Sequence, residues 1–199
     1  MQHTIITISR QHGSGGREIG RRVAEQLGIP FYDREIIELA AKDSHIDISF
    51  FENSETKDAG SLIYDLSAGG HVMLPLTDRV YLQQVKTIRD IAQKGGCVIV
   101  GRCADAVLAD YPHVLRVFIY ANSEARRKRV EMFYHESAEE LEKLEKKRSS
   151  YYQHYTGKRF GDAENYDMCL DSGSLGLDEC VKAICSAYRS HEKASPKPE

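Results

Sequence analysis

The chain has 199 residues, of which 41% are apolar and 29% are charged, and its formal net charge is −3. This length and composition are typical of one soluble globular domain with a sizeable hydrophobic core. The slightly acidic balance excludes a general attraction to nucleic acid or to anionic membranes, so a site for an anion has to be built locally.

No stretch reaches the roughly 18 apolar residues of a membrane span, and the N-terminus lacks a signal-peptide pattern. The five cysteines form no C-x-x-C motif, and the histidines show no metal-ligand spacing. These features indicate a cytoplasmic protein with mostly buried thiols, no protein-bound metal, and neither a nucleic-acid nor a membrane partner. The oligomeric state is left open.

Apolar runs of strand length alternate with helical patterns. Residues 4–9, "TIITIS", are β-branched and apolar on both faces, which favours a buried parallel strand. Further strands are expected at 29–33, 97–101, 114–120 and 167–171. A helix that carries Ile19, Val23 and Leu27 on one face is expected to end at Gly28, and another is expected from Asp33 onward. Further helices are expected over roughly 77–94, 122–134 and 177–189. The alternation predicts an α/β fold with a parallel sheet covered on both faces.

Two regions depart from this alternation. Residues 44–76 are mixed in character, and "SAGGHVMLP" within them is expected to be a mobile loop. Residues 137–166 begin with a charged helix whose apolar stripe is thin, so it could move as a unit. Because ligands of such sheets lie at the carboxyl ends of the strands, both regions are candidate covers. Residues 1–190 are expected to form the domain, and 191–199 a disordered tail.

The stretch "SRQHGSGGREIG", residues 9–20, contains a glycine loop (residues 10–17) between a buried strand and an amphipathic helix. Backbone N–H groups of such a loop, together with a helix N-terminus, bind phosphate. A tight turn without a ligand is the alternative. A dinucleotide fingerprint fails, because Glu18 stands where its third glycine is required. The residues expected to bind a nucleotide are His12, Gly13, Ser14, Gly15, Gly16, Arg17 and Glu18.

Three segments then point to a family. They are "TIITISRQHGSGGREIGRRVAEQLGIPFYD", "VIVGRCADAVLADYPHVLRVFIYANSEARRKRV" and "YDMCLDSGSLGLDECVKAI". Together they resemble the cytidylate kinase-like family of the P-loop nucleoside monophosphate kinase superfamily. The resemblance implies a P-loop kinase fold, with a five-stranded parallel sheet flanked by helices, an acceptor-binding insert at about 34–76 and a helical lid at about 137–166.

The loop departs from the family pattern in its charges. In a gapless alignment Gly16 stands where these kinases have the phosphate-binding lysine, and Arg10 stands at the first glycine. Arg10 is the first candidate for the replaced charge, because a guanidinium can serve phosphate as an ammonium does. Its alternative role is a salt bridge that closes the end of the sheet. Arg17 is expected to face away from the core, towards water.

Other charged residues are candidates for either binding or a simpler role. The resemblance places Arg126 and Arg129 at the lid hinge, where arginines clamp the transferring phosphate, although a solvated helix face would need no such role. Arg148, Lys158 and Arg159 are further lid candidates. The expected acceptor contacts are Asp33 and Arg34, with a helix N-cap as the alternative for Asp33, and Arg102 with Asp105, which could hold Arg102 or replace the aspartate that Cys103 displaces.

These features predict an ATP- and Mg²⁺-dependent kinase whose substrates are small nucleotides, most simply CMP or dCMP. The same fold could also serve a nucleotide- or phosphate-binding protein without turnover, or a kinase of another small acceptor. Turnover separates the first hypothesis from the second, and the identity of the acceptor separates it from the third.

Overall fold

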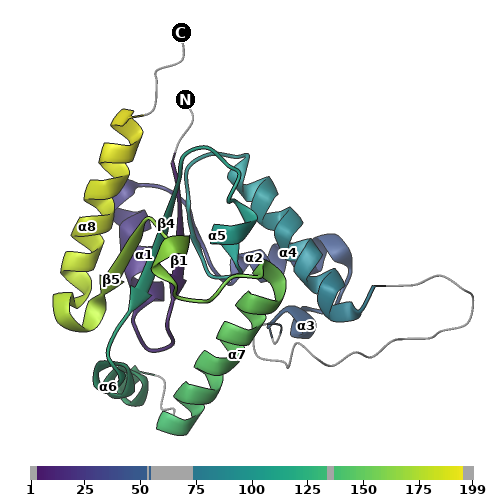
Figure 1. The fold of residues 1–199 in the computed structure, drawn as a ribbon. Helices are drawn as coiled ribbons and strands as arrows, with labels where there is room; N and C mark the ends of the chain where they lie inside the picture. The colour runs from purple at the N-terminus through teal and green to yellow at the C-terminus, as the bar shows by residue number, and fades with distance from the viewer. Residues whose placement is uncertain (1–3, 53, 55–73, 134–136, 195–199) are drawn as a thin grey trace, which may run out of the picture.

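The computed structural model describes residues 4–52, 54, 74–133 and 137–194. Five parallel strands form one sheet in the order β2-β3-β1-β4-β5 (Figure 1). The strands are β1 (Ile5–Arg10), β2 (Phe31–Tyr32), β3 (Val98–Val100), β4 (Val114–Tyr120) and β5 (Met168–Asp171). All five lie where the apolar runs predicted them, and the prediction of a parallel sheet is confirmed.

The central strand β1 sets the position of the glycine loop. Ile8 is paired with Val100 of β3 on one side and with Val117 of β4 on the other. Because parallel strands point the same way, the loop that follows Arg10 emerges in the middle of the carboxyl edge. The ends of β3 and β4 therefore flank it.

Helices connect the strands. They are α1 (Gly16–Leu27), α2 (Glu35–Ser44), α3 (Ile48–Glu52), α4 (Leu76–Ala92), α5 (Ala104–Val107), α6 (Ser123–Phe133), α7 (Ala138–Thr156) and α8 (Ser172–Ala194), with a short 3₁₀ helix η1 (Ala163–Asn165). The chain was expected to enter a helix at Asp33, but α2 begins at Glu35. α8 is broken at Gly176, whose φ of 78° is not helical, so its regular part begins where the sequence predicted.

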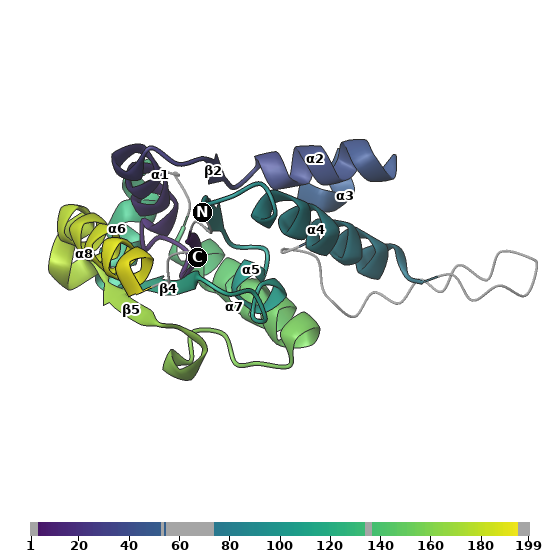
Figure 2. The same ribbon diagram turned by 90° about the horizontal axis from the view of Figure 1, so that it is seen from above.

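The two faces of the sheet carry separate cores (Figure 2). On one face α1 and α8 pack Ile19 and Ile184 against β1 and β4. On the other face α2, α4 and α5 cover Ile5 and Ile99. Each strand of the centre is thus apolar on both sides, which explains the continuous apolar runs in the sequence. Four of the five thiols are buried, as expected, and Cys169 is exposed.

Part of the C-terminal segment that was expected to be disordered is helical. Residues 191–194, assigned to a disordered tail, form the last turn of α8, and Glu192 Oε1 accepts a hydrogen bond of 2.8 Å from the backbone N–H of Thr4. The rest of that tail lies outside the described residues, as does the expected mobile loop apart from Leu74 and Pro75.

The charged helix α7 is better anchored than its thin apolar stripe indicated. Its first turn has a capping box between Ser137 and Glu140. Further along, Leu141, Tyr151 and Tyr152 are buried. Both tyrosines act as core residues here, because their rings pack in the interior, and the hydroxyl of Tyr152 donates to Asp105.

Candidate functional site

Two positions of the glycine loop require glycine. Gly13 and Gly15 have φ of 78° and 79°, in the left-handed region that favours glycine. A Cβ at Gly13 would lie 2.8 Å from Val130 Cγ2, and one at Gly15 would lie 2.9 Å from Leu177 Cδ2 and run into the Arg129 guanidinium. The loop is therefore packed closely between α6 and α8.

Hydrogen bonds within the loop and from the segments that follow β4 and β5 hold the loop in place. The hydroxyl of the fully buried Ser14 donates to the carbonyl of Gln11 at 2.8 Å. Ser172, at the end of β5, donates to the carbonyl of Ser14 at 2.6 Å. The backbone N–H of Ala121 donates to Gln11 Oε1 at 3.2 Å. Ser14 thus turns its hydroxyl inward, and only its backbone is left for a ligand.

A cavity of about 200 Å³, the loop cavity, lies over the glycine loop and the N-terminus of α1. Its position at the positive end of a helix suits an anion. The cavity gathers the residues expected to bind a nucleotide, except Ser14 and Glu18, and adds Arg10 and Gln11 from the same loop and two residues from elsewhere in the chain. The lining is Arg10, Gln11, His12, Gly13, Gly15, Gly16, Arg17, Asp33 and Arg148.

The two arginines of the loop differ in their surroundings. Arg10 runs past Gly16 to the end of β3, where a Cβ at Gly101 would lie 2.9 Å from its Cζ atom. Among the described residues no carboxylate pairs with Arg10, so the salt bridge that would close the sheet is not found there. Arg17 has a side chain that is 61% exposed, as expected, and its Nε lies 2.6 Å from Asp33 Oδ2.

The expected contacts at the start of α2 divide between the cavity and the surface. Asp33 lines the loop cavity, and the N-cap of α2 is Arg34, without a capping side chain, so the N-cap alternative for Asp33 is wrong. Arg34 pairs with Glu52 at 2.5 Å on the surface of the insert. Glu18 likewise pairs with Arg21 along the exposed face of α1, so neither of these side chains reaches the loop cavity.

The turn after β3 is strained. Gly101, Arg102 and Cys103 have φ of 76°, 57° and 54°, so two residues with side chains adopt the left-handed region in succession. Such strain persists only where neighbouring structure imposes it, and it often marks a functional site. Arg102 Nη1 donates hydrogen bonds to Ser54 Oγ at 3.1 Å and to the Phe51 carbonyl at 3.4 Å. It thereby ties the turn to the insert.

Asp105 was expected either to hold Arg102 or to replace the missing aspartate, and it does not contact Arg102. Its carboxylate, 4% exposed, accepts from Ser9 Oγ at 3.2 Å and from the Tyr152 hydroxyl at 2.6 Å. Burial raises the pKa of Asp105 above its ordinary value. Burial also raises the pKa of Tyr152, with the neighbouring Asp105 charge acting in the same direction. Asp105 is thus part of the interior rather than of an open acceptor pocket.

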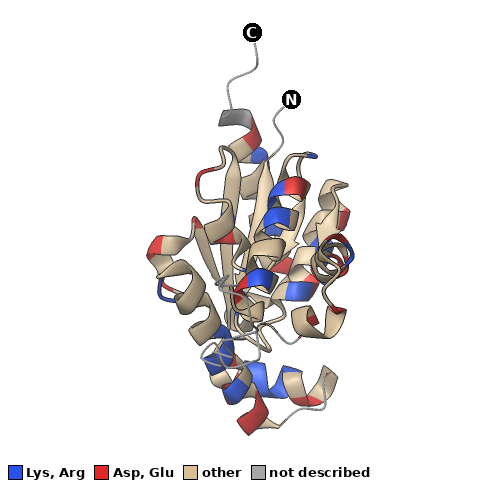
Figure 3. Cartoon of the chain, turned by 90° about the vertical axis from the view of Figure 1, so that its right-hand side faces the viewer, with Lys and Arg blue, Asp and Glu red and all other residues tan. Residues whose placement is uncertain are grey.

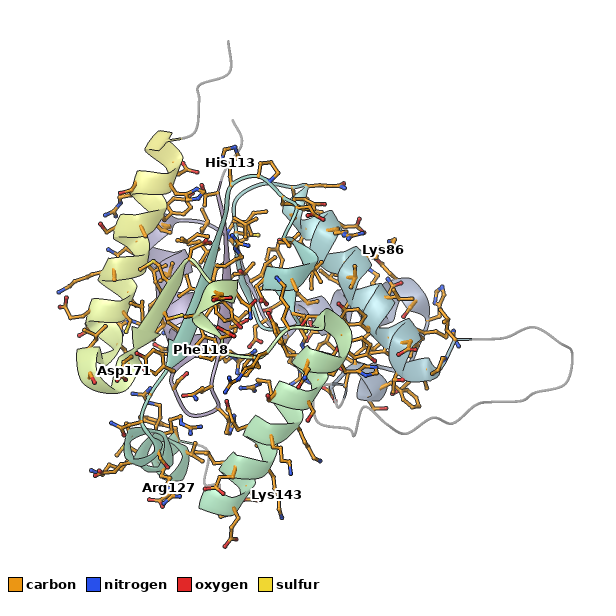
Figure 4. All side chains as sticks on the ribbon, viewed as in Figure 1. Lys86, His113, Phe118, Arg127, Lys143 and Asp171 are labelled. Carbon is orange, nitrogen blue, oxygen red and sulfur yellow. The ribbon has the colours of Figure 1, made fainter. Side chains whose placement is uncertain are left out.

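The lid-hinge arginines meet the glycine loop. Arg126 Nη1 lies 3.5 Å from the carbonyl of His12, and the Nε of Arg126 is buried without a partner. Arg129 Nη1 is likewise buried without a partner, beside Gly15. Arg127, between them in sequence and labelled in Figure 4, pairs instead with Glu142 of α7 at 3.2 Å. Arg159 is exposed and lines none of the described cavities. Lys and Arg gather on this lower part of the molecule, with acidic residues among them (Figure 3).

Helix α7 contributes the lid candidate Arg148 and two residues that the sequence did not single out for the site, Glu145 and Tyr152. Glu145 Oε2 accepts from the backbone N–H of His12 at 2.7 Å, and Arg148 Nη1 donates to the carbonyl of Arg10 at 3.0 Å. Tyr152 follows one turn later. The spacing of 145, 148 and 152 places these residues on one face of the helix, and this spacing from Arg148 is the sequence signal that could have indicated Glu145 and Tyr152.

A second cavity, the Cys103 cavity, lies on the other side of Arg10 and Arg148. These two arginines line both cavities, so they form the boundary between them. The Cys103 cavity measures about 10 Å³, which is roughly the room of one water molecule. Tyr151, Tyr152 and Phe160 fill the remaining space. A larger acceptor therefore needs a movement of this aromatic cluster or a position further out.

A third cavity, of about 690 Å³, lies between β4, α6 and α7. It shares Gln11 with the loop cavity and contains Arg126 and Glu145. Phe118, labelled in Figure 4, projects into it from β4 beside Phe160. The cavity thus joins the glycine loop to a partly aromatic space under α7.

The strand order, with β1 leading through a glycine loop into α1, is the fold of the P-loop kinases. A gluconokinase from Sinorhizobium meliloti shares it with a TM-score of 0.60 at 15% identity, over 97% of each chain. A crystal structure of an uncharacterized protein from Eubacterium ventriosum matches more closely, with a TM-score of 0.71 and 26% identity over 94% of this chain and 99% of that one.

Residues 5–174 match the cytidylate kinase-like family, and the chain belongs to that family. A cytidylate kinase from Pyrobaculum neutrophilum is 28% identical to it over 186 residues, which are 89% of each chain. Family and fold together support phosphoryl transfer in general, with small-molecule substrates. Among the described residues no helix has the length and apolar character to span a membrane, and no three His, Cys, Asp or Glu residues come together as a metal site.

Proposed function

We propose that the protein transfers the γ-phosphoryl group of ATP to a nucleoside monophosphate, of which CMP or dCMP is the simplest candidate, in the cytoplasm. The glycine loop would bind the donor phosphates through backbone N–H groups between Gly13 and Arg17. The acceptor would approach from the side of the Cys103 cavity. The insert at about 34–76 and the lid at about 137–166 would close over the two substrates.

The observation that carries this proposal is the boundary formed by Arg10 and Arg148. In phosphoryl transfer the phosphorus passes between donor and acceptor oxygens, so the protein mainly supplies position and positive charge. Two guanidinium groups that line both cavities would supply both, with Arg10 in the role of the missing lysine. Arg126 and Arg129 bring further charge from the opposite side of the loop.

The boundary also favours a phosphate acceptor over an alcohol. An alcohol must lose its proton as the new P–O bond forms, so kinases of alcohols need a base, whereas a phosphate oxygen is already ionised. Among the described residues that line the two cavities Asp33 is the one carboxylate, and Arg17 pairs with it. This favours a monophosphate over a hydroxyl acceptor such as a sugar acid. Cys103, at the position of the family's base-contacting aspartate, leaves the choice of base open.

A Mg²⁺ ion would be held mainly by the ATP phosphates and water, as is usual for this ion, which needs only one or two protein ligands. Asp33 is the group in the loop cavity with the chemistry to serve as such a ligand. When bound, the ion would neutralise charge on the β- and γ-phosphates. Within the chain itself, Arg10 and Arg148 orient the phosphates, and Arg17 competes for the Asp33 carboxylate.

The test is an ADP-release assay with ATP and a panel of acceptors: CMP, dCMP, UMP, AMP and GMP, with shikimate and gluconate as alcohols and ATP alone as the control. We expect a monophosphate to stimulate ADP release well above ATP alone. Stimulation only by an alcohol would replace the acceptor class. ATP binding without release in any mixture would support the alternative of a nucleotide-binding protein without turnover.

A further inference from the structure

Asp105 joins the two chain segments that carry the boundary arginines. One of its oxygens accepts from Ser9, the residue before Arg10. The other accepts from Tyr152, which lies one helical turn after Arg148. Arg148 in turn donates to the carbonyl of Arg10 at 3.0 Å. The contacts of Asp105 with Ser9 and Tyr152 and of Arg148 with Arg10 thus form a closed circuit. A single buried carboxylate is therefore hydrogen-bonded to both segments, from points 96 and 47 residues away in sequence.

We propose that the hydrogen bond from Tyr152 to Asp105 positions Arg148 for phosphoryl transfer, which makes Tyr152 and Asp105 positioning residues. The proposal rests on the proposed function, because it assigns Arg148 a place beside the transferred group.

Helix geometry explains how this bond acts at a distance. Residues four apart lie on the same face of a helix, about one turn apart, so a shift of α7 along its axis at Tyr152 also moves Arg148. The O–H···O distance of 2.6 Å is that of a strong hydrogen bond to a carboxylate, so the bond resists sliding of α7. A misplacement of about 1 Å at a reacting group reduces rate by about 100-fold, so even a small slide matters.

The same helix provides a matched control. Tyr155 donates to Asp78 of α4 at 3.2 Å, so it also ties α7 to the body through a tyrosine and an aspartate. It stacks on Tyr81 with ring centroids 4.0 Å apart, and it lines neither the loop cavity nor the Cys103 cavity. Removal of its hydroxyl tests general anchoring of α7 without touching the circuit.

The experiment compares Tyr152→Phe, Arg148→Ala, the double variant and Tyr155→Phe with the unmodified chain. ADP release gives kcat and KM, calorimetry gives ATP affinity, and thermal unfolding checks folding. We expect Tyr152→Phe to lower kcat about tenfold with KM changed less than about threefold, and to have no further effect when Arg148 is alanine. Tyr155→Phe should keep kcat within about twofold.

Equal effects of Tyr152→Phe with and without Arg148, or an equal loss in Tyr155→Phe, would show that the bond only stabilises the fold and would overturn the proposal. If Tyr152→Phe fails to fold, Asp105→Asn weakens the same bond and takes its place in the cycle. If the unmodified chain binds ATP but gives no turnover, the proposed function is wrong. The two single variants and the double variant are then compared by their ATP affinities. An effect of Tyr152→Phe that disappears when Arg148 is alanine supports the positioning role, and effects that simply add refute it. A chain that does not bind ATP would refute both.

Discussion

The guanidinium of Arg10 lies against Gly101. The Arg10 side chain therefore extends from the glycine loop to the end of the neighbouring strand β3. A Cβ at Gly101 would lie 2.9 Å from Arg10 Cζ, a distance that real Cβ atoms do not adopt. The glycine at the end of β3 therefore makes room for the arginine. Under the proposed function, this pairing would bring the charge of Arg10 to the region between donor and acceptor.

Arg10→Ala should lower kcat by about 10²–10³, or about 3–4 kcal/mol of transition-state stabilisation, with a smaller effect on ATP affinity. The reason is that charge grows on the bridging and γ-oxygens during transfer, so the lost contact matters most in the transition state. Arg10→Lys should recover part of the activity, since an ammonium cannot span two oxygens. Steady-state kinetics and calorimetric titration of ATP measure the two effects.

Arg17→Ala is the comparison variant from the same loop. Its side chain is 61% exposed and paired with Asp33, so kcat should change by less than about tenfold, or 1.4 kcal/mol. An inactive Arg17→Ala with a nearly normal Arg10→Ala would mean that Arg17 replaces the lysine. Thermal melts of both variants separate loss of charge from loss of stability.

Arg129→Ala should weaken ATP binding by roughly tenfold or more, because a buried guanidinium N–H without a partner is satisfied when a phosphate arrives. The melting temperature without ligand should change little, since no hydrogen bond of Nη1 is lost. Arg127→Ala, which removes a half-exposed ion pair with Glu142 from the same helix, should bind ATP as the unmodified chain does. Equal ATP affinities of the Arg129 and Arg127 variants would contradict this role.

Gly15→Ala should strain the glycine loop and push the Arg129 and Leu177 side chains away from it. A left-handed φ costs an alanine about 1–2 kcal/mol, and here the new Cβ would also collide with Arg129 and Leu177. Gly28→Ala has a similar φ, 67°, but no atom within 4 Å of the new Cβ, so it isolates the backbone strain alone. Urea unfolding should show a larger loss of stability for Gly15→Ala, and only this variant should lose ATP binding. Similar losses in both would indicate that backbone strain accounts for the whole effect.

Asp105→Asn should change how stability depends on pH. Burial raises the pKa of folded Asp105 above the unfolded value of about 3.9, so the folded chain retains a proton that the unfolded chain releases. The stability of the unmodified chain therefore falls as pH rises from about 4 through the raised pKa. The asparagine variant lacks this titration, and any hydrogen bond that it loses adds a constant offset.

Urea unfolding of both chains from about pH 4 to pH 8 measures the difference. The free energy of unfolding of the variant minus that of the unmodified chain should rise with pH and then level off. A difference that stays flat or falls would mean that the folded pKa of Asp105 is not raised.

Much of the fold follows from local patterns. The β-branched run before the glycine loop, the amphipathic stripe after it and the buried runs near Val100 and Val117 identify strands and helices, because burial on one or two faces imposes a period on the sequence. The glycines at 13 and 15 could be read as a loop for the same local reason. Helix ends were less certain, as the start of α2 and the end of α8 show, since caps depend on a few atoms.

The amino-acid sequence by itself determined the alternation of strands and helices, the glycine loop, the set of candidate cations and the family. Only the tertiary structure decided which of those cations meet: it brings Arg10 and Arg148 together, turns Arg34 to the surface and buries Asp105 against Tyr152. The physical reason is distance along the chain. The contacts from Glu145 to His12 and from Ser172 to Ser14 join residues 133 and 158 positions apart, and only the packing of whole elements against the sheet sets such distances.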